Sequence, residues 1–238
     1  MMPADTNEKK MPVLEHLREL RRHLLWSVGS VAVLSMVLFY WADPLLMYLA
    51  RPVPRLVFIG PSEAFVARLK VAFMGGLILS MPLVLYHAGA FVWPALKDRE
   101  RRLVGASVWA VVLFFALGVA FAFFLAVPVG LKFLMGFGGS VIEPMLSADR
   151  YLSFVGAMLL VFGIVFELPV LLVVLSRIGI VTPAFLRQKR APVIVAIFIV
   201  AAIVTPPDVV SQCLVAIPMI LLYELGILLS YWLKSRGA

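Results

Sequence analysis

The stretch YLSFVGAMLLVFGIVFELPVLLVVL, Tyr151–Leu175, decides the fold class of this chain. From Leu152 to Ser176 its only acidic or basic residue is Glu167. A helix needs about 20 apolar residues to cross the hydrocarbon core of a bilayer, and this stretch is long enough. The sequence therefore predicts a transmembrane helix that carries one carboxylate at membrane depth.

Five more apolar runs predict an all-α membrane protein with six spans and a single domain, residues 1–238. The spans cover about residues 24–42, 71–93, 103–129, 151–175, 191–205 and 209–232. Of the 238 residues, 63% are hydrophobic and 14% are charged. Soluble domains run nearer 45–50% apolar and about 25% charged. The first ten residues are charged and do not resemble a cleavable signal peptide.

Two details of the predicted spans depend on prolines. Ala191–Thr205 would reach only about 22 Å as a helix, and Pro206 and Pro207 prevent its extension. Either the bilayer thins beside it or a tilted neighbour fills the gap, and both remain open. Asp43–Lys70, which contains four prolines, is expected to form a cap with a short helix near Ser62–Arg68.

Basic residues predict the orientation of the chain. The net charge is +8, and 15 of the 21 basic residues fall in the two terminal segments and the loops after the second and fourth spans. By the positive-inside rule, these segments and both termini are cytoplasmic. We interpret the charge as topology and contact with anionic lipid, and we expect no nucleic-acid partner.

The sequence contains no recognisable catalytic or metal-binding motif. Cys213 is the only cysteine, and His16 and His23 are better explained as surface residues beside arginines than as metal ligands. We therefore expect no enzyme activity, no metal and no cofactor.

Glu167 is the strongest candidate for a functional residue in a span. An ionisable group at membrane depth is costly without a partner, which favours a functional role. The alternative is a hydrogen bond that only joins two helices. Glu224 lies closer to the cytoplasmic end of the last span, where it could reach the interface.

Glu15, Glu19 and Glu100 lie among arginines on the predicted cytoplasmic side. Composition alone favours local ion pairs, such as Glu19 with Arg22 at helical spacing. The alternative is an acidic pocket that accepts a guanidinium group, because arginine pairs with carboxylates in a planar, two-pronged geometry.

The segment TPPDVVSQ, Thr205–Gln212, joins the last two spans. Thr205 and Gln212 could bind partner helices through hydrogen bonds. The alternative is an ordinary turn in which Asp208 caps the following helix.

Six motifs, in order and spacing, resemble those of the TatC family of twin-arginine protein translocases. They are HLREL (16–20), PSEAF (61–65), FVWPAL (91–96), RERR (99–102), FELP (166–169) and TPPDVVSQ (205–212). The resemblance runs from about residue 12 to residue 232. One departure is His23, where the family usually has a strongly basic residue.

This resemblance implies a receptor in the bacterial inner membrane, driven by the proton-motive force, for the Arg-Arg signal peptides of folded cargo proteins. Glu19 and Glu100 match the family's cytoplasmic glutamates and would bind the arginines, with Glu15 secondary. Glu167 would face a concave, glove-like pocket. Thr205 and Gln212 would dock the single-span partners TatB and TatA. Asp208, Pro206 and Pro207 would have a structural role. Copies of the chain would associate with one another. The alternatives are a proton-coupled small-solute transporter using Glu167 and a scaffold that only gathers membrane helices.

Overall fold

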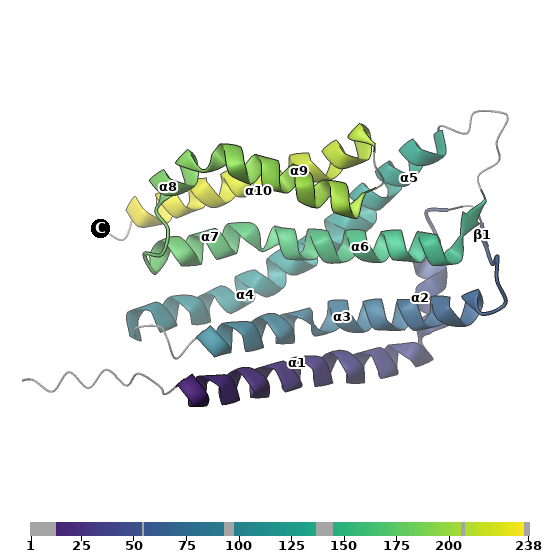
Figure 1. Ribbon diagram of the computed structural model, residues 1–238, viewed down its shortest axis with the longest axis horizontal. Coiled ribbons are helices and arrows are strands. Elements are labelled where there is room, and N and C mark those ends of the chain that lie inside the picture. Colours follow the sequence, from purple (N-terminus) through teal and green to yellow (C-terminus); the bar gives the residue numbers. More distant parts are fainter. Residues whose placement is uncertain (1–12, 54, 93–97, 137–144, 206–207, 236–238) are drawn as a thin grey trace, which may run out of the picture.

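The structure is a computed structural model that describes residues 13–53, 55–92, 98–136, 145–205 and 208–235 (Figure 1). The helices and strands are, in chain order, α1 (Val13–Tyr40), α2 (Ala42–Leu49), β1 (Leu56–Val57), α3 (Glu63–Val92), α4 (Asp98–Phe121), a π-helix (Ala122–Ala126), α5 (Val127–Gly136), β2 (Leu146–Ser147), α6 (Ala148–Phe166), α7 (Leu168–Arg177), α8 (Pro183–Gln188), α9 (Arg190–Val204) and α10 (Val209–Ser235).

Long apolar helices dominate the described part of the chain. Five helical stretches within it are long and apolar enough to cross a membrane. A sixth, α9, has 15 residues and ends at the predicted hairpin. The prediction of an all-α membrane protein is therefore confirmed.

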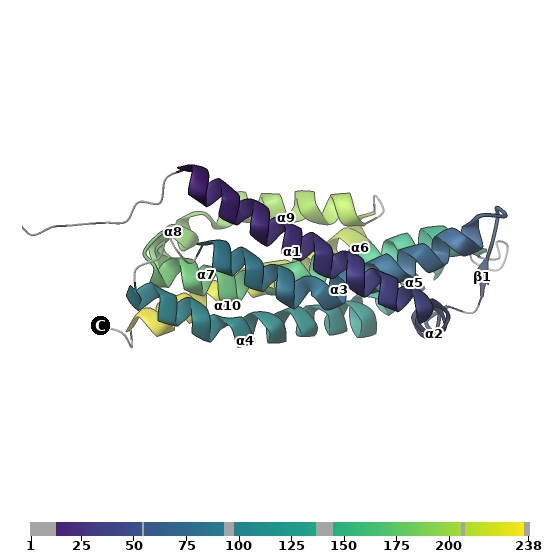
Figure 2. The same cartoon turned by 90° about the horizontal axis from the view of Figure 1, so that it is seen from below.

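The centre of the bundle is α6. Its side chains Leu152, Val155, Met158 and Phe162 are almost fully buried. In Figure 1, α9 and α10 lie on one side of α6, and α4, α3 and α1 lie in turn on the other. Figure 2 shows α4 and α9 at opposite edges, with α1 crossing in front of the bundle. Consequently α1 is an outer helix, packed on α3.

Glycines allow two helix pairs to approach closely. A Cβ atom at Gly76 of α3 would lie 2.6 Å from the backbone nitrogen of Ser35 in α1. A Cβ atom at Gly118 of α4 would lie 2.4 Å from the carbonyl oxygen of Phe162 in α6. Small residues at such crossings let membrane helices pack backbone to backbone.

The expected short helix near Ser62–Arg68 is wrong. Residues 63–68 form the start of α3, directly after Ser62, and the separate short helix of this connection is α2. The reason is tertiary: Lys70 of α3 donates to Asp149 and Ser153 of α6, so its charge is neutralised within the bundle and the helix continues.

The third apolar run forms helix beyond the predicted end at Val129. Helix α4 passes through the π-helix into α5, which ends at Gly136. Pro128 lies in the first turn of α5, directly after the π-helix. The wider π turn accommodates a residue that has no backbone N–H to donate.

Candidate functional site

The predicted cytoplasmic carboxylates lie on helices that meet at one end of the bundle. Helices α1 and α4 begin at this end, and α10 ends there (Figure 1). Glu19 lies in the second turn of α1 and is half-buried. Glu15 and Glu100 lie in the first turns of α1 and α4, and their side chains fall outside what the structure describes. We name this end, marked by Glu19 and the start of α4, the receptor end, after the role that the family resemblance predicts for it.

A histidine pair joins α1 to α3 near the receptor end. The Nδ1 atoms of His23 and His87 lie 3.1 Å apart, and both side chains are half-buried. One ring must donate its Nδ1–H to the unprotonated Nδ1 of the other, because a neutral imidazole has one donor and one acceptor nitrogen. His23 thus contacts α3, in contrast to the surface position expected from the sequence.

Glu167 lies at a break between two helices. It follows the last residue of α6 and precedes α7. Pro169 has no N–H with which to bond the carbonyl of Val165, so the regular pattern cannot continue. Instead the N–H of Glu167 donates to Ile164 at 3.1 Å, three residues back. The break therefore places the Glu167 carboxylate at an interruption of the helix inside an apolar span.

The surroundings of Glu167 are apolar and tightly packed. Phe121 of α4 contacts Phe162 and Phe166 of α6, with ring centroids 5.1 and 5.4 Å away. Within the described residues, the buried Oε1 atom of Glu167 has no hydrogen-bond partner. A buried acceptor of this kind costs folding free energy unless a donor reaches it.

Polar side chains stabilise the α9–α10 hairpin from within. The Thr205 hydroxyl, whose residue is only 6% exposed, donates to the carbonyl of Ala201 at 2.8 Å. The Gln212 amide donates to the carbonyl of Phe198 at 2.9 Å and so links α10 to α9. Asp208 accepts from the N–H of Ser211 at 2.7 Å, which is the predicted cap of α10. Pro206 and Pro207 lie outside the described residues.

Glu224, near the end of α10, forms an ion pair. Its Oε2 atom lies 2.5 Å from the guanidinium of Arg190, the first residue of α9. Both side chains are about two-fifths exposed, so the carboxylate reaches a polar environment.

Glu63 organises the opposite end of the bundle, and sequence reasoning missed this role. Its Oε2 atom accepts from the backbone N–H of Ile59 at 2.6 Å, and Oε1 accepts from the Ser147 hydroxyl at 2.5 Å and the Asp149 N–H at 3.0 Å. Nearby, β1 and β2 pair in parallel, with Leu56 opposite Leu146. The signal in the sequence was the PSEAF motif, which places a carboxylate at the first residue of a long helix.

Side chains that could bind a metal ion do not form a cluster among the described residues. There, no group of three or more histidine, cysteine or acidic side chains is placed to bind a metal ion.

Comparisons with known proteins identify the family. Residues 15–218 match the family model described as Sec-independent protein translocase protein (TatC). A relative of that name from Carboxydothermus hydrogenoformans is 37% identical over 234 residues, which cover 96% of each chain. One from Aquifex aeolicus is 38% identical over 227 residues, covering 92% of this chain and 94% of its own.

Solved structures agree with the sequence relatives. A crystal structure of a protein named twin arginine translocase receptor TatC superimposes with a TM-score of 0.83 at 38% identity, covering 91% of this chain and 98% of the other. A second crystal structure of that name, in the detergent DDM, gives a TM-score of 0.84. These matches confirm the predicted family and favour a protein translocase over a small-solute transporter. The chain belongs to the TatC family of Sec-independent protein translocase proteins, as a multi-pass protein of the inner membrane.

Proposed function

We propose that this protein is the translocase subunit that binds Arg-Arg signal peptides of folded cargo at its receptor end. Glu19 and Glu100 accept the two guanidinium groups, and Glu15 contributes from one turn before Glu19. The observation that carries the proposal is the likeness to solved structures of a twin-arginine translocase receptor. In the proposed orientation, the receptor end and both termini are cytoplasmic.

Carboxylates suit this ligand because of the geometry of arginine. A guanidinium group presents parallel N–H donors to a carboxylate, whereas a lysine ammonium is a point charge. Glu19 is half-buried, and partial removal from water strengthens such an interaction. A pair of glutamates on α1 and α4 would therefore prefer Arg-Arg over Lys-Lys.

The apolar part of the signal peptide then lies along the bundle toward Glu167. In support, the buried Oε1 atom of Glu167 lacks a hydrogen-bond partner among the described residues, at the break between α6 and α7. A hydrogen-bond donor on the peptide or on a partner helix would satisfy it.

The α9–α10 hairpin is the proposed docking site for the single-span partners TatB and TatA. Thr205 and Gln212 already bond within the hairpin, so their role is to fix its shape. The contact surface is the apolar side of α9, where Val195, Ile199 and Ile203 are all more than half exposed. Proton-motive force drives transport, and copies of the chain associate in the receptor complex.

Binding of an Arg-Arg signal peptide to the Glu100→Gln variant tests the proposal. Charge-assisted hydrogen bonds contribute about 1.5–3 kcal/mol, so we expect binding to weaken by roughly one to two decades. The affinity for a Lys-Lys peptide, already low, should change little. Fluorescence anisotropy with the protein in nanodiscs would measure both.

Glu224→Gln is the matched control, since it removes a carboxylate that already pairs with Arg190. We expect its peptide affinity to stay within about twofold of the unmodified protein, as for a partly exposed ion pair. Equal losses in Glu100→Gln and Glu224→Gln would indicate a general charge effect. Unchanged affinity in Glu100→Gln would remove this residue from the site.

A further inference from the structure

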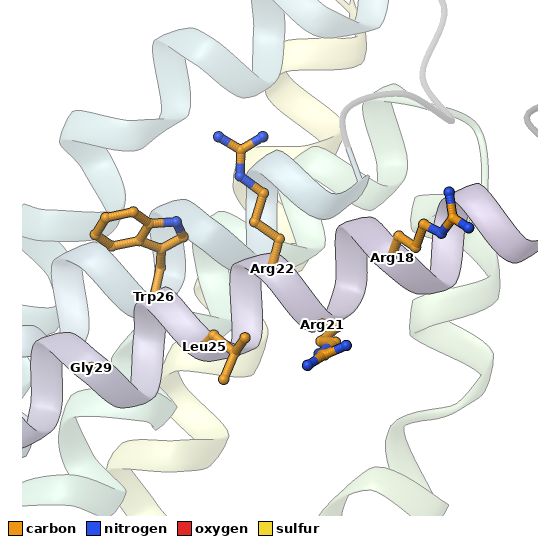
Figure 3. Close-up of a pocket in the computed structure, with 6 residues that line it drawn as sticks. All are labelled: Arg18, Arg21, Arg22, Leu25, Trp26 and Gly29. Atoms are coloured by element: carbon orange, nitrogen blue, oxygen red, sulfur yellow. The ribbon is translucent and has the colours of Figure 1, made fainter.

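Three arginines and three residues of the next two turns line a groove on α1 (Figure 3). The groove has a volume of about 590 Å³, and its lining is Arg18, Arg21, Arg22, Leu25, Trp26 and Gly29. Figure 3 shows Arg22 and Trp26 projecting from the same side of α1, with Arg18 one turn toward the start of the helix. We name it the α1 groove. Its charge is confined to one end, and the rest is apolar.

The α1 groove faces away from the protein. His23, Ser35 and Leu38 mark the side of α1 that touches α3. The groove residues lie on the other side of the helix, where Leu25 is 60% and Trp26 is 61% exposed. In a membrane protein this side meets lipid, not another helix of the chain.

The apolar end of the groove is open over Gly29. A Cβ atom added at this glycine would meet no heavy atom within 4 Å. Gly29 lies seven residues beyond Arg22, or about 10 Å farther along the helix. Tryptophan is enriched where the headgroup region meets the acyl chains, which is the position of Trp26 between the arginines and Gly29. The groove therefore changes from polar to apolar over the length expected at a leaflet boundary.

The spacing of the three arginines favours binding of an anion. Arg21 and Arg22 lie three and four residues after Arg18 on one helix, and like charges at these spacings repel. Within the described part of the chain, no carboxylate forms an ion pair with any of the three. A phosphate group suits guanidinium donors in the same two-pronged way as a carboxylate does.

We propose that the α1 groove binds one anionic phospholipid, with its phosphate on Arg18 and Arg22 and one acyl chain running past Trp26 over Gly29. Arg21, which projects from the other side of α1 in Figure 3, adds positive charge nearby. Charge complementarity selects the headgroup, and the open surface at Gly29 admits the chain. The bound lipid neutralises the start of α1 and fixes its depth in the membrane. The proposed lipid site uses no carboxylate, so lipid binding can be measured without a signal peptide.

Lipid titration of the purified protein in a neutral detergent tests the proposal. Native mass spectrometry would count bound dioleoylphosphatidylglycerol against dioleoylphosphatidylcholine. We expect one tightly bound phosphatidylglycerol per chain and at least tenfold weaker phosphatidylcholine. Replacing all three arginines by glutamine should weaken phosphatidylglycerol binding by about a hundredfold, given the contribution of each basic residue at an anionic surface.

Two matched controls distinguish specific lipid binding in the α1 groove from nonspecific attraction to positive charge. The triple change Arg177→Gln, Arg187→Gln and Lys189→Gln removes the same charge elsewhere and should leave binding within about threefold. Gly29→Leu fills the groove without altering any charge and should weaken phosphatidylglycerol binding about tenfold. Gly89→Leu should not weaken it, although a Cβ atom at Gly89 would also meet nothing within 4 Å.

Three results would overturn the proposal. The first is equal binding of the two lipids, and the second is an equal loss in both triple variants. The third is undiminished binding in Gly29→Leu, which would leave an arginine cluster that binds headgroups without a chain. Glycerol 3-phosphate, the headgroup without chains, should not compete at millimolar concentration, and full competition would likewise exclude a lipid site.

Discussion

At the scale of single residues, Glu63 shows how one carboxylate can hold several segments together. It accepts hydrogen bonds from Ile59 and Gly60, just before α3, and from Ser147 and Asp149 at the start of α6. Both of its oxygens are used, and an ionised carboxylate accepts more strongly than an amide. The end of the bundle opposite the receptor end therefore depends on this side chain.

We expect Glu63→Gln to lower the thermal unfolding midpoint by a few degrees, because the amide has one acceptor oxygen where the carboxylate has two. Asp43→Asn is the matched control. Asp43 pairs with Arg68 at 2.9 Å, but both side chains are more than half exposed, so its loss should have no measurable effect. A midpoint that is unchanged in Glu63→Gln would show that the network is not needed for stability.

Single residues also differ in how well the sequence predicts them. Glu167 was identifiable because a lone carboxylate in an apolar run is unusual, and the structure adds that it lies at a helix break before Pro169. The link that Glu63 makes to α6 was not predictable, because the donors Ser147 and Asp149 lie 84 and 86 positions away in the sequence. The role of His23 depends in the same way on His87, 64 positions away.

At the scale of helices, the crossing of α1 and α3 depends on Gly76. The backbone of Ser35 occupies the space that any side chain at this position would need. Because the obstacle is backbone, a rotamer change cannot relieve the clash, and the two helices must separate.

We therefore expect Gly76→Val to destabilise the protein by about 3 kcal/mol or more, the upper end of the range for overpacking. Gly89→Val on the same helix is the control, since a Cβ atom at Gly89 meets nothing within 4 Å. Thermal unfolding in detergent, followed by size-exclusion chromatography, would compare them. Similar midpoints for the two variants would contradict a close α1–α3 contact.

The existence of the helices was predictable from apolar length, but their ends were not. The run before Pro206 ends where the proline rule says it should. By contrast, α3 begins before Arg68 and Lys70 because contacts from α6 neutralise Lys70, and α5 passes Pro128 because a π turn precedes it. The start of α3 and the continuation of the helix past Pro128 both depend on features of the fold that cannot be read from the neighbouring sequence.

At the scale of the whole molecule, the two ends of the bundle differ in structure. One end is fixed by Glu63, the β1–β2 pair and the bond from Tyr151 to the carbonyl of Leu49. The other end gathers the starts of α1 and α4 and the end of α10, with an arginine-lined groove beside it (Figures 1 and 3). A hydrogen-bonded cap at one end and charged helix termini at the other are compatible with the proposed receptor, which would bind its ligand from one side.

Photocrosslinking from a signal peptide tests the proposed receptor most directly. A photoreactive residue placed beside the paired arginines should crosslink to α1 around Glu19 and to the first turn of α4 around Glu100. An excess of unlabelled Arg-Arg peptide should abolish both crosslinks, and an equal excess of Lys-Lys peptide should not. Crosslinks confined to the α9–α10 hairpin, or equal competition by both peptides, would contradict binding at the receptor end.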